Sequence, residues 1–329
     1  MLVVENAYDN GNTHELSFMQ MKPSASKYNA DVLIYDAYQF LTDGYIERQS
    51  VITNFLNKKI YIDGTYELMS EPVLNFLNEA FKSLKNFYYF FIPSNQTETS
   101  DILKKCLQKG LVIHSSQYFA DYPRRYQPIY NEKIKKRKFL FYTGKPSKER
   151  TLLVSLLSYY NLLDNGYVSY FGENYIDSNF DDQKSNDIFD IDSQVPLFLD
   201  EKNKVKKGLD KLEIPLTLDV NVFGRETAHA KNFNGDYYKA VDFCIISESD
   251  HENGFFITEK TVKCINLNKK FIAFAAPNYI ENLKAYYKDK LNTDISHLTD
   301  WCNTSYSKEQ STFKRAEKII QIVKEETKE

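Results

Sequence analysis

Short apolar runs of β-strand character alternate with amphipathic helical patterns along most of the 329 residues. In the first part of the chain such runs lie at 32–35, 59–62, 87–92 and 111–113, after a first strand at 1–5. The segments between them carry apolar residues at helical spacing, as in 70–84. Strands separated by helices pair in parallel, because a helix brings the chain back to the same edge of the sheet. The pattern therefore predicts an α/β protein with parallel sheets covered by helices.

The alternation of strand and helix patterns is interrupted once and then resumes, which predicts two domains. Residues 121–138 contain Pro123 and Pro128 and end in five basic residues between 132 and 138, a composition typical of a linker. Further strands are predicted at 139–142, 167–171, 241–247 and 271–275, and the polar stretch 176–211 is interpreted as a solvated insertion. We expect an N-terminal domain at 1–130, a second domain at 131–307, and a final helix at 308–329 that packs back across the hinge.

Composition excludes several classes of protein. The 42 Lys and Arg residues nearly balance 45 Asp and Glu, giving a net charge of −3 that excludes a strong general attraction to polyanions but allows a local basic groove. There is no apolar run of 18 residues and no signal-peptide pattern, so no membrane span is expected. The 4 cysteines form no C-x-x-C pair and are interpreted as buried free thiols of a cytoplasmic protein. Abundant Lys, Asn and Ile are typical of an AT-rich genome, such as that of a virus, a phage included, or of a low-GC bacterium.

The most informative segment is 246–261, where a strand ends, a polar loop follows and a helix begins. Ligands of parallel sheets bind at the carboxyl ends of the strands, and a helix N-terminus attracts phosphate. Glu248 at the strand end could accept hydrogen bonds from ribose hydroxyls, and Lys260 in the first helical turn could neutralise a diphosphate. Thr258 is the predicted helix cap. The alternative is a well-capped surface helix, because the helix dipole alone favours Glu259 at this position.

A second strand, turn and helix start lies at 139–153. Its turn carries Gly144 and Lys145, Ser147 is the predicted cap, and Arg150 follows in the first turn. The spacing fits neither a Walker loop nor G-x-G-x-x-G. Lys145 and Arg150 could cradle a phosphate, and the alternative is a solvated basic turn. Cations at two helix starts could together stabilise a departing diphosphate without a metal.

A catalytic base for transfer to a hydroxyl would have to be a carboxylate near a strand end of the first domain. Asp36, Asp63 and Glu67 meet that condition, as does Asp9. For each of them the alternative is a residue that merely forms a turn. The histidines at 14, 114, 229 and 251 have no triad or metal spacing and are interpreted as loop or core residues.

The stretch 241–276 resembles the donor-binding motif of α-1,3-fucosyltransferase-like enzymes and related bacterial and phage glycosyltransferase-like proteins. The resemblance rests on the acidic strand end Glu248, the helix start Phe256-Ile257-Thr258-Glu259-Lys260 and the apolar strand 271–277, where Asn278 stands in place of the usual Gly. Residues 138–170 resemble the start of the same domain. The resemblance implies a GT-B fold, two Rossmann-like domains with parallel sheets facing across a cleft. It also implies that Glu248 contacts the ribose, and that Lys260 and Arg150 contact the phosphates.

These features together indicate a metal-independent glycosyltransferase. It would move a sugar from a nucleotide-sugar donor, with no other cofactor, to a glycan or to a hydroxymethylated base in phage DNA. Two alternatives stay open. One is a non-catalytic module that binds a nucleotide sugar. The other is a nucleic-acid-binding protein that uses Arg124, Arg125 and the basic residues of 133–138.

Overall fold

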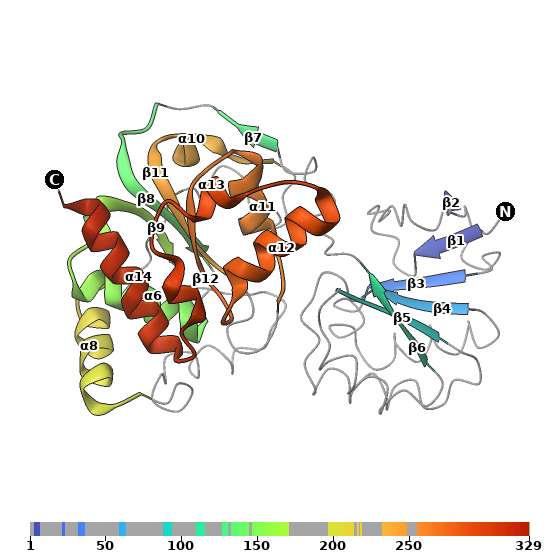
Figure 1. Cartoon of the computed structure of the whole chain (residues 1–329), viewed down its shortest axis with the longest axis horizontal. Helices are drawn as coiled ribbons and strands as arrows, with labels where there is room; N and C mark the ends of the chain where they lie inside the picture. Colours follow the sequence, from blue (N-terminus) through green and yellow to red (C-terminus); the bar gives the residue numbers. More distant parts are fainter. Residues whose placement is uncertain are drawn as a thin grey trace. The chain divides into compact units, whose positions relative to one another are not determined.

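The fold is taken from a computed structural model of the whole chain (Figure 1). It describes residues 127–130, 133–144, 147–170, 197–213, 216, 218, 232–248 and 255–328, and six strands in the first part of the chain. The chain divides into two compact units, 1–118 and 119–329. The sequence analysis places this boundary after residue 130. The helices and parallel sheets confirm the predicted α/β character.

The first unit holds a six-stranded sheet in the order β2-β1-β3-β4-β5-β6. All neighbouring strands in it are parallel. The strands are β1 (Val3–Asn6), β2 (Lys22–Pro23), β3 (Val32–Asp36), β4 (Lys59–Asp63), β5 (Tyr88–Pro93) and β6 (Gly110–Ser115). Five of them coincide with the runs read from the sequence. The helices predicted between these strands lie outside the described residues.

The second unit is built on a four-stranded parallel sheet in the order β12-β11-β8-β9. Its strands are β8 (Arg137–Gly144), β9 (Gly166–Tyr170), β11 (Val241–Ser247) and β12 (Phe271–Phe274). A second, two-stranded sheet joins β7 (Gln127–Ile129) to β10 (Asn232–Asn234) in parallel. Part of the predicted linker at 121–138 is therefore strand, because Pro128 needs no amide donor in a short edge pairing.

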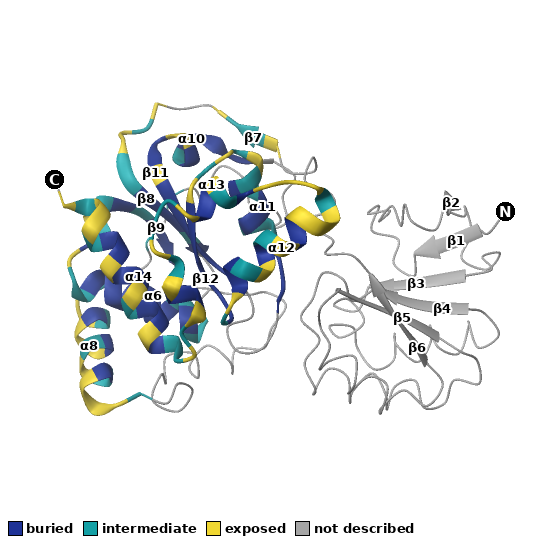
Figure 2. Ribbon diagram, in the orientation of Figure 1, coloured by how far each residue is buried: buried dark blue, intermediate teal, exposed yellow. Residues whose placement is uncertain are grey.

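Helices cover the four-stranded sheet, and their sheet-facing residues are buried (Figure 2). They are α6 (Lys148–Tyr159), α8 (Leu199–Leu209), α10 (Gly235–Lys239), α11 (Glu259–Asn266), α12 (Tyr279–Leu291), α13 (Ser296–Thr299) and α14 (Thr312–Thr327), with 3-10 turns η4 (Leu163–Asn165) and η8 (Thr304–Lys308). Within the described ranges, none of the helices is apolar over a length that would let it cross a bilayer.

The polar stretch 176–211 is not solvated throughout, because its last part forms α8 against α6. Val205 is 3% exposed, and a Cβ on Gly208 would lie 2.0 Å from the carbonyl oxygen of Ser155 in α6. Gly208 thus allows the two helix backbones to approach closely. The packing of α8 on α6 could not be predicted from the Lys-rich composition, because only a narrow stripe of α8 is apolar.

The final helix α14 packs on α6 and β12 of the second unit. Its Arg315 is fully buried, and the guanidinium donates hydrogen bonds to the carbonyl oxygens of Glu309 and Gln310 in the loop before the helix. The helix begins at Thr312, after the cap Ser311, and so starts later than residue 308. Packing across a hinge stays a prediction.

Candidate functional site

The connectivity of the second sheet creates a topological switch point between β8 and β11. From β8 the chain passes through α6 to β9 on one side, and from β11 it passes through α11 to β12 on the other side. Right-handed crossovers in opposite directions place the two helices on opposite faces of the sheet. The helices therefore diverge beyond the carboxyl ends of β8 and β11. Ligands of open α/β sheets bind in the crevice at such a point.

Two buried polar atoms without a partner lie at the carboxyl ends of these two strands. The atoms are Oγ1 of Thr143 in β8 and Oε2 of Glu248, which follows β11 directly. Among the residues that the structure describes, neither atom has a hydrogen-bond partner. Buried polar atoms are paired in the great majority of cases, so these two atoms are available for a contact with a ligand at this edge.

The other carboxylate oxygen of Glu248 is fully used within the protein. Glu248 is 1% exposed, and its Oε1 accepts a hydrogen bond from Tyr279 Oη at 2.8 Å and one from the backbone amide of Thr258 at 3.3 Å. The hydroxyl of Thr261 donates a third, short hydrogen bond to the same oxygen. Glu248 thereby joins the end of β11 to the first turns of both α11 and α12.

Tyr279 acts as a permanent donor in this cluster. Burial, followed by the negative charge of Glu248, raises the pKa of Tyr279 well above its usual value. Its hydroxyl therefore stays protonated at neutral pH and donates to Glu248. The ring packs on Phe255 with the ring centroids 5.5 Å apart, which fixes the direction of the hydroxyl.

The N-terminus of α11 carries the cation predicted from the sequence. Thr258 caps the helix by accepting a hydrogen bond from the Lys260 amide at 3.3 Å, as predicted. The ammonium of Lys260 lies 3.3 Å from a carboxylate oxygen of Glu259 and 3.5 Å from the Thr258 hydroxyl. Both charged side chains are largely shielded from solvent, with 20% and 14% of Lys260 and Glu259 exposed.

The N-terminus of α6 is arranged in a similar way at the end of β8. Ser147 accepts a hydrogen bond from the amide of Arg150 at 3.3 Å, which confirms the predicted cap. Its hydroxyl donates to the buried Glu149 at 3.1 Å, and Lys148 lies 3.6 Å from the same carboxylate. Arg150 stands half-buried in the first turn. Two capped helices with cations in their first turns thus begin at one edge of the sheet.

The start of α12, which carries Tyr279, is held by a residue far along the chain. Asn278 occupies the cap position with φ of 63° and makes no capping hydrogen bond with its side chain. Asn adopts this left-handed conformation more readily than most residues. Ser307 of η8 acts instead. Its hydroxyl accepts from the Ile280 amide at 3.2 Å, and its carbonyl oxygen accepts from the Asn278 amide at 2.6 Å.

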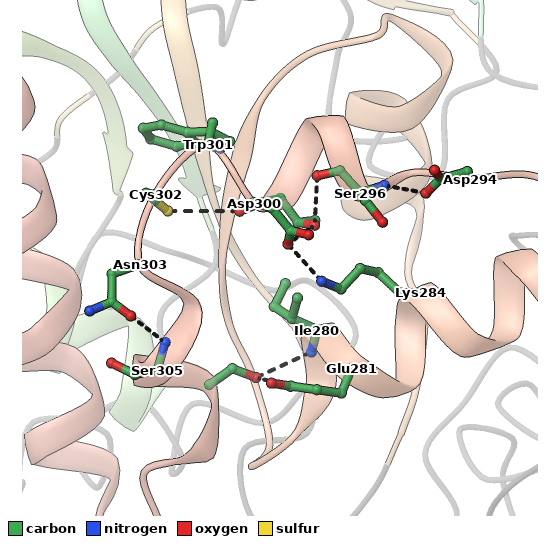
Figure 3. A network of polar contacts seen from close by, with 12 residues as sticks. Ile280, Glu281, Lys284, Asp294, Ser296, Asp300, Trp301, Cys302, Asn303 and Ser305 are labelled. Carbon is green, nitrogen blue, oxygen red and sulfur yellow. Dashed lines mark hydrogen bonds and ion pairs between the residues drawn. The ribbon is translucent and has the colours of Figure 1, made fainter.

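A polar network continues from this contact along α12 (Figure 3). Ser307 donates to Glu281 at 3.1 Å, and Lys284 forms an ion pair with Asp300 at 2.6 Å. These contacts attach α12 to the segment after α13, where the Trp301 indole nitrogen donates to the Phe271 carbonyl oxygen at 3.4 Å. The network fixes Tyr279 relative to the sheet, and so fixes Glu248.

The basic segment of the predicted linker lies at the other end of the sheet from this site. Lys135, Lys136 and Lys138 precede or begin β8, whereas Thr143 lies at its carboxyl end, about 20 Å further along the strand. Lys239 and Lys270 stand just before β11 and β12 at the same edge as the basic segment. We call these five lysines the basic rim. Within it, Lys138 forms an ion pair with Asp242 at 3.8 Å.

Of the candidate donor-site residues, Glu248, Thr258, Glu259 and Lys260 lie together after the carboxyl end of β11, whereas Arg150 lies in the first turn of α6, which follows the carboxyl end of the neighbouring strand β8. Asp36 and Asp63 end the neighbouring strands β3 and β4 of the first unit. Lys145, Glu67 and Asp9 lie outside the described residues.

Sequence reasoning missed three residues of the site, Thr143, Thr261 and Tyr279. Thr261 follows Thr258 by one helical turn, so helical spacing could have indicated it. Nothing local indicates Tyr279, which lies 31 residues from Glu248.

Comparison of the chain with protein-family models, curated proteins and solved structures finds no match. Within the described residues, no three His, Cys, Asp or Glu side chains are grouped so that they could hold a metal ion.

Proposed function

We propose that this protein is a glycosyltransferase of GT-B architecture, whose second unit binds a nucleotide-sugar donor at the switch point between β8 and β11. The observation that carries the proposal is the pair of orphaned polar atoms, Thr143 Oγ1 and Glu248 Oε2, at the carboxyl ends of neighbouring strands. A nucleotide sugar carries hydroxyls that can donate hydrogen bonds to these two atoms. Its diphosphate is an anion of the kind that helix N-termini bind.

The proposed roles follow from chemistry and position. Glu248 accepts a hydrogen bond from the ribose, while Lys260 and Arg150, in the first turns of α11 and α6, bind the diphosphate. As the bond between the anomeric carbon and the phosphate oxygen breaks, negative charge grows on the leaving diphosphate, and both cations stabilise it. A carboxylate of the first unit, Asp36, Asp63 or Glu67, removes the proton from the attacking hydroxyl. The acceptor is a glycan or a hydroxymethylated base in DNA, reached in the cytoplasm of a cell or of a phage-infected host.

A ligand panel tests the donor site first. Thermal shifts are measured with UDP-, GDP-, CMP- and dTDP-sugars, and the nucleotide that stabilises the protein most is used in a transfer assay with glycan and hydroxymethylated-DNA acceptors. Stabilisation by one nucleotide class and release of the corresponding nucleotide, a diphosphate from UDP-, GDP- or dTDP-sugars and CMP from CMP-sugars, support the proposal. Binding without transfer indicates the non-catalytic module, and no stabilisation by any nucleotide contradicts the proposal.

The basic rim favours a second candidate function, nucleic-acid binding. Lys135, Lys136, Lys239 and Lys270 are exposed. Lys239 lies 5.8 Å from the ring centre of Tyr130, and Lys270 lies 5.7 Å from that of Trp301. Lysines interleaved with aromatic rings suit a phosphate backbone and unstacked bases. Salt-sensitive retardation of DNA in a gel supports this function, and absence of retardation at low salt contradicts it.

A further inference from the structure

Three adjacent strands of the second sheet, β12, β11 and β8, each have a cation beside an aromatic ring at their amino ends. The pairs and the distances from cation to ring centre are Lys270 with Trp301 at 5.7 Å, Lys239 with Tyr130 at 5.8 Å, and Arg137 with Tyr167 at 4.7 Å. A nucleotide joins an anionic phosphate to a base with a π face, so each pair offers a partner for both of its parts.

The three rings are held in place by the protein and stay partly accessible. The Trp301 indole nitrogen donates to the carbonyl oxygen of the first residue of β12 at 3.4 Å, and the Tyr167 hydroxyl donates to the Lys135 carbonyl oxygen at 2.6 Å. Tyr130 lies against Gly235, where a Cβ would meet its ring at 2.6 Å. Tyr130 is 51% exposed, and the other two rings are half-buried. A base can therefore stack on these rings with little loss of side-chain freedom.

The charges of the basic rim are mostly not neutralised by the protein. Lys138 has Asp242 as its partner, and in the described ranges of the chain the other four lysines form no ion pair with a carboxylate. The whole chain carries a net charge of −3, so this excess of positive charge is local. A polyanion is therefore attracted to this edge of the sheet rather than to the surface in general.

We infer that this edge binds single-stranded nucleic acid, with the lysines of the basic rim on the phosphates and the three rings against unstacked bases. The inference rests on the second candidate function, nucleic-acid binding, and names the type of strand. In a duplex the faces of the bases are stacked on one another, whereas a single strand leaves them free to stack on aromatic side chains. The rim lies about 20 Å along β8 from Thr143, so a strand bound here leaves the proposed donor site open.

The only tryptophan of the chain, Trp301, provides a direct measurement at this edge. The full chain is titrated with oligo-dT, with its duplex with oligo-dA, and with heparin, which carries charge but no bases. We expect oligo-dT to bind about fivefold or more tightly than the duplex and to quench the tryptophan emission, because a base stacks on the indole. Heparin should leave the emission unchanged. Duplex binding as tight as that of oligo-dT, or equal quenching by heparin, would overturn the inference.

A variant separates stacking from charge. Tyr130→Leu removes the most exposed of the three rings and keeps every cation. We expect it to weaken oligo-dT binding by about fivefold or more, with no change in the slope of log affinity against log salt concentration. Phe198→Leu is the matched control, because Phe198 is an aromatic residue that is 71% exposed at the start of α8, outside the basic rim. Unchanged affinity in Tyr130→Leu, or an equal loss in the control, would overturn the role of the rings.

The failure of the inference differs from the failure of nucleic-acid binding. If the protein binds neither oligo-dT nor the duplex at low salt, nucleic-acid binding is wrong and the inference falls with it. If the protein binds the duplex at least as tightly, nucleic-acid binding stands and the inference alone is wrong. Cosedimentation with phosphatidylglycerol vesicles without any binding of oligo-dT would overturn both in favour of a membrane surface.

Discussion

Asp36 and Asp63 are register partners at the last positions of the neighbouring parallel strands β3 and β4. Their α-carbons are therefore separated by one strand spacing, roughly 5 Å. Two carboxylic residues therefore stand side by side at the carboxyl ends of adjacent strands, the edge at which parallel sheets bind ligands.

The first prediction concerns which of these residues acts as the base. Asp36→Asn and Asp63→Asn keep size and polarity but remove the proton acceptor, so the variant of the true base should lose transfer by at least a hundredfold. Nucleotide affinity should not change, because the proposed donor site lies in the second unit. Transfer rates and calorimetry on both variants decide the question. If both retain normal transfer, Glu67 is the next candidate.

The second prediction concerns Lys260, which stands in the first turn of α11. The helix dipole disfavours a cation at this position, whereas the ion pair with Glu259 at 3.3 Å favours it, so the two effects on stability oppose each other. We expect Lys260→Ala to weaken nucleoside diphosphate binding by about tenfold or more, with a melting temperature within about 2 °C of the wild type. Lys263→Ala, near the other end of the same helix, is the control and should bind normally. Normal turnover in Lys260→Ala would show that the donor-site assignment is wrong.

The third prediction concerns the basic rim. Lys135→Glu combined with Lys136→Glu should weaken DNA binding uniformly across sequences. The slope of log affinity against log salt concentration should become shallower by about 2, because about two phosphate contacts are lost. Binding is measured by fluorescence anisotropy at several salt concentrations. Lys206→Glu with Lys207→Glu on α8 changes the net charge equally and serves as the control. An equal loss in both double variants would show that only net charge matters.

The fourth prediction concerns the approach of α8 to α6 at Gly208. Gly208→Ala introduces a Cβ only 2.0 Å from the backbone oxygen of Ser155, so the helices must separate. We expect a loss of about 1–3 kcal/mol in the free energy of unfolding, measured by urea denaturation. Lys207→Ala, at an exposed neighbouring position, should change this free energy by less than about 0.5 kcal/mol. A more stable Gly208→Ala protein would mean that helix propensity outweighs the contact.

The fifth prediction is a pH dependence of stability due to Cys302. Burial, followed by the charges of Glu326 and Asp300, raises the pKa of Cys302 to about 12. In the unfolded chain the thiol ionises near pH 8.5, so above that pH the folded state binds more protons and stability falls as pH rises. The stability of the wild type relative to Cys302→Ala should therefore decrease by about 1 kcal/mol or more between pH 8 and pH 10. No such change is expected between pH 6 and pH 8, and a constant difference at all pH values would contradict the assignment.

The sequence alone determined the local elements of this protein. The strand β11, the caps Ser147 and Thr258, and the first-turn cations Arg150 and Lys260 follow from periodicity and capping, which act over a few residues.

Only the tertiary structure decided how these elements combine. It brought Tyr279 to Glu248, placed Ser307 at the start of α12 in place of an Asn278 cap, and packed the Lys-rich α8 through Gly208. Each of these contacts joins residues about 30 or more positions apart, so it depends on how the helices are placed over the sheet, and short-range sequence patterns carry no information about that placement.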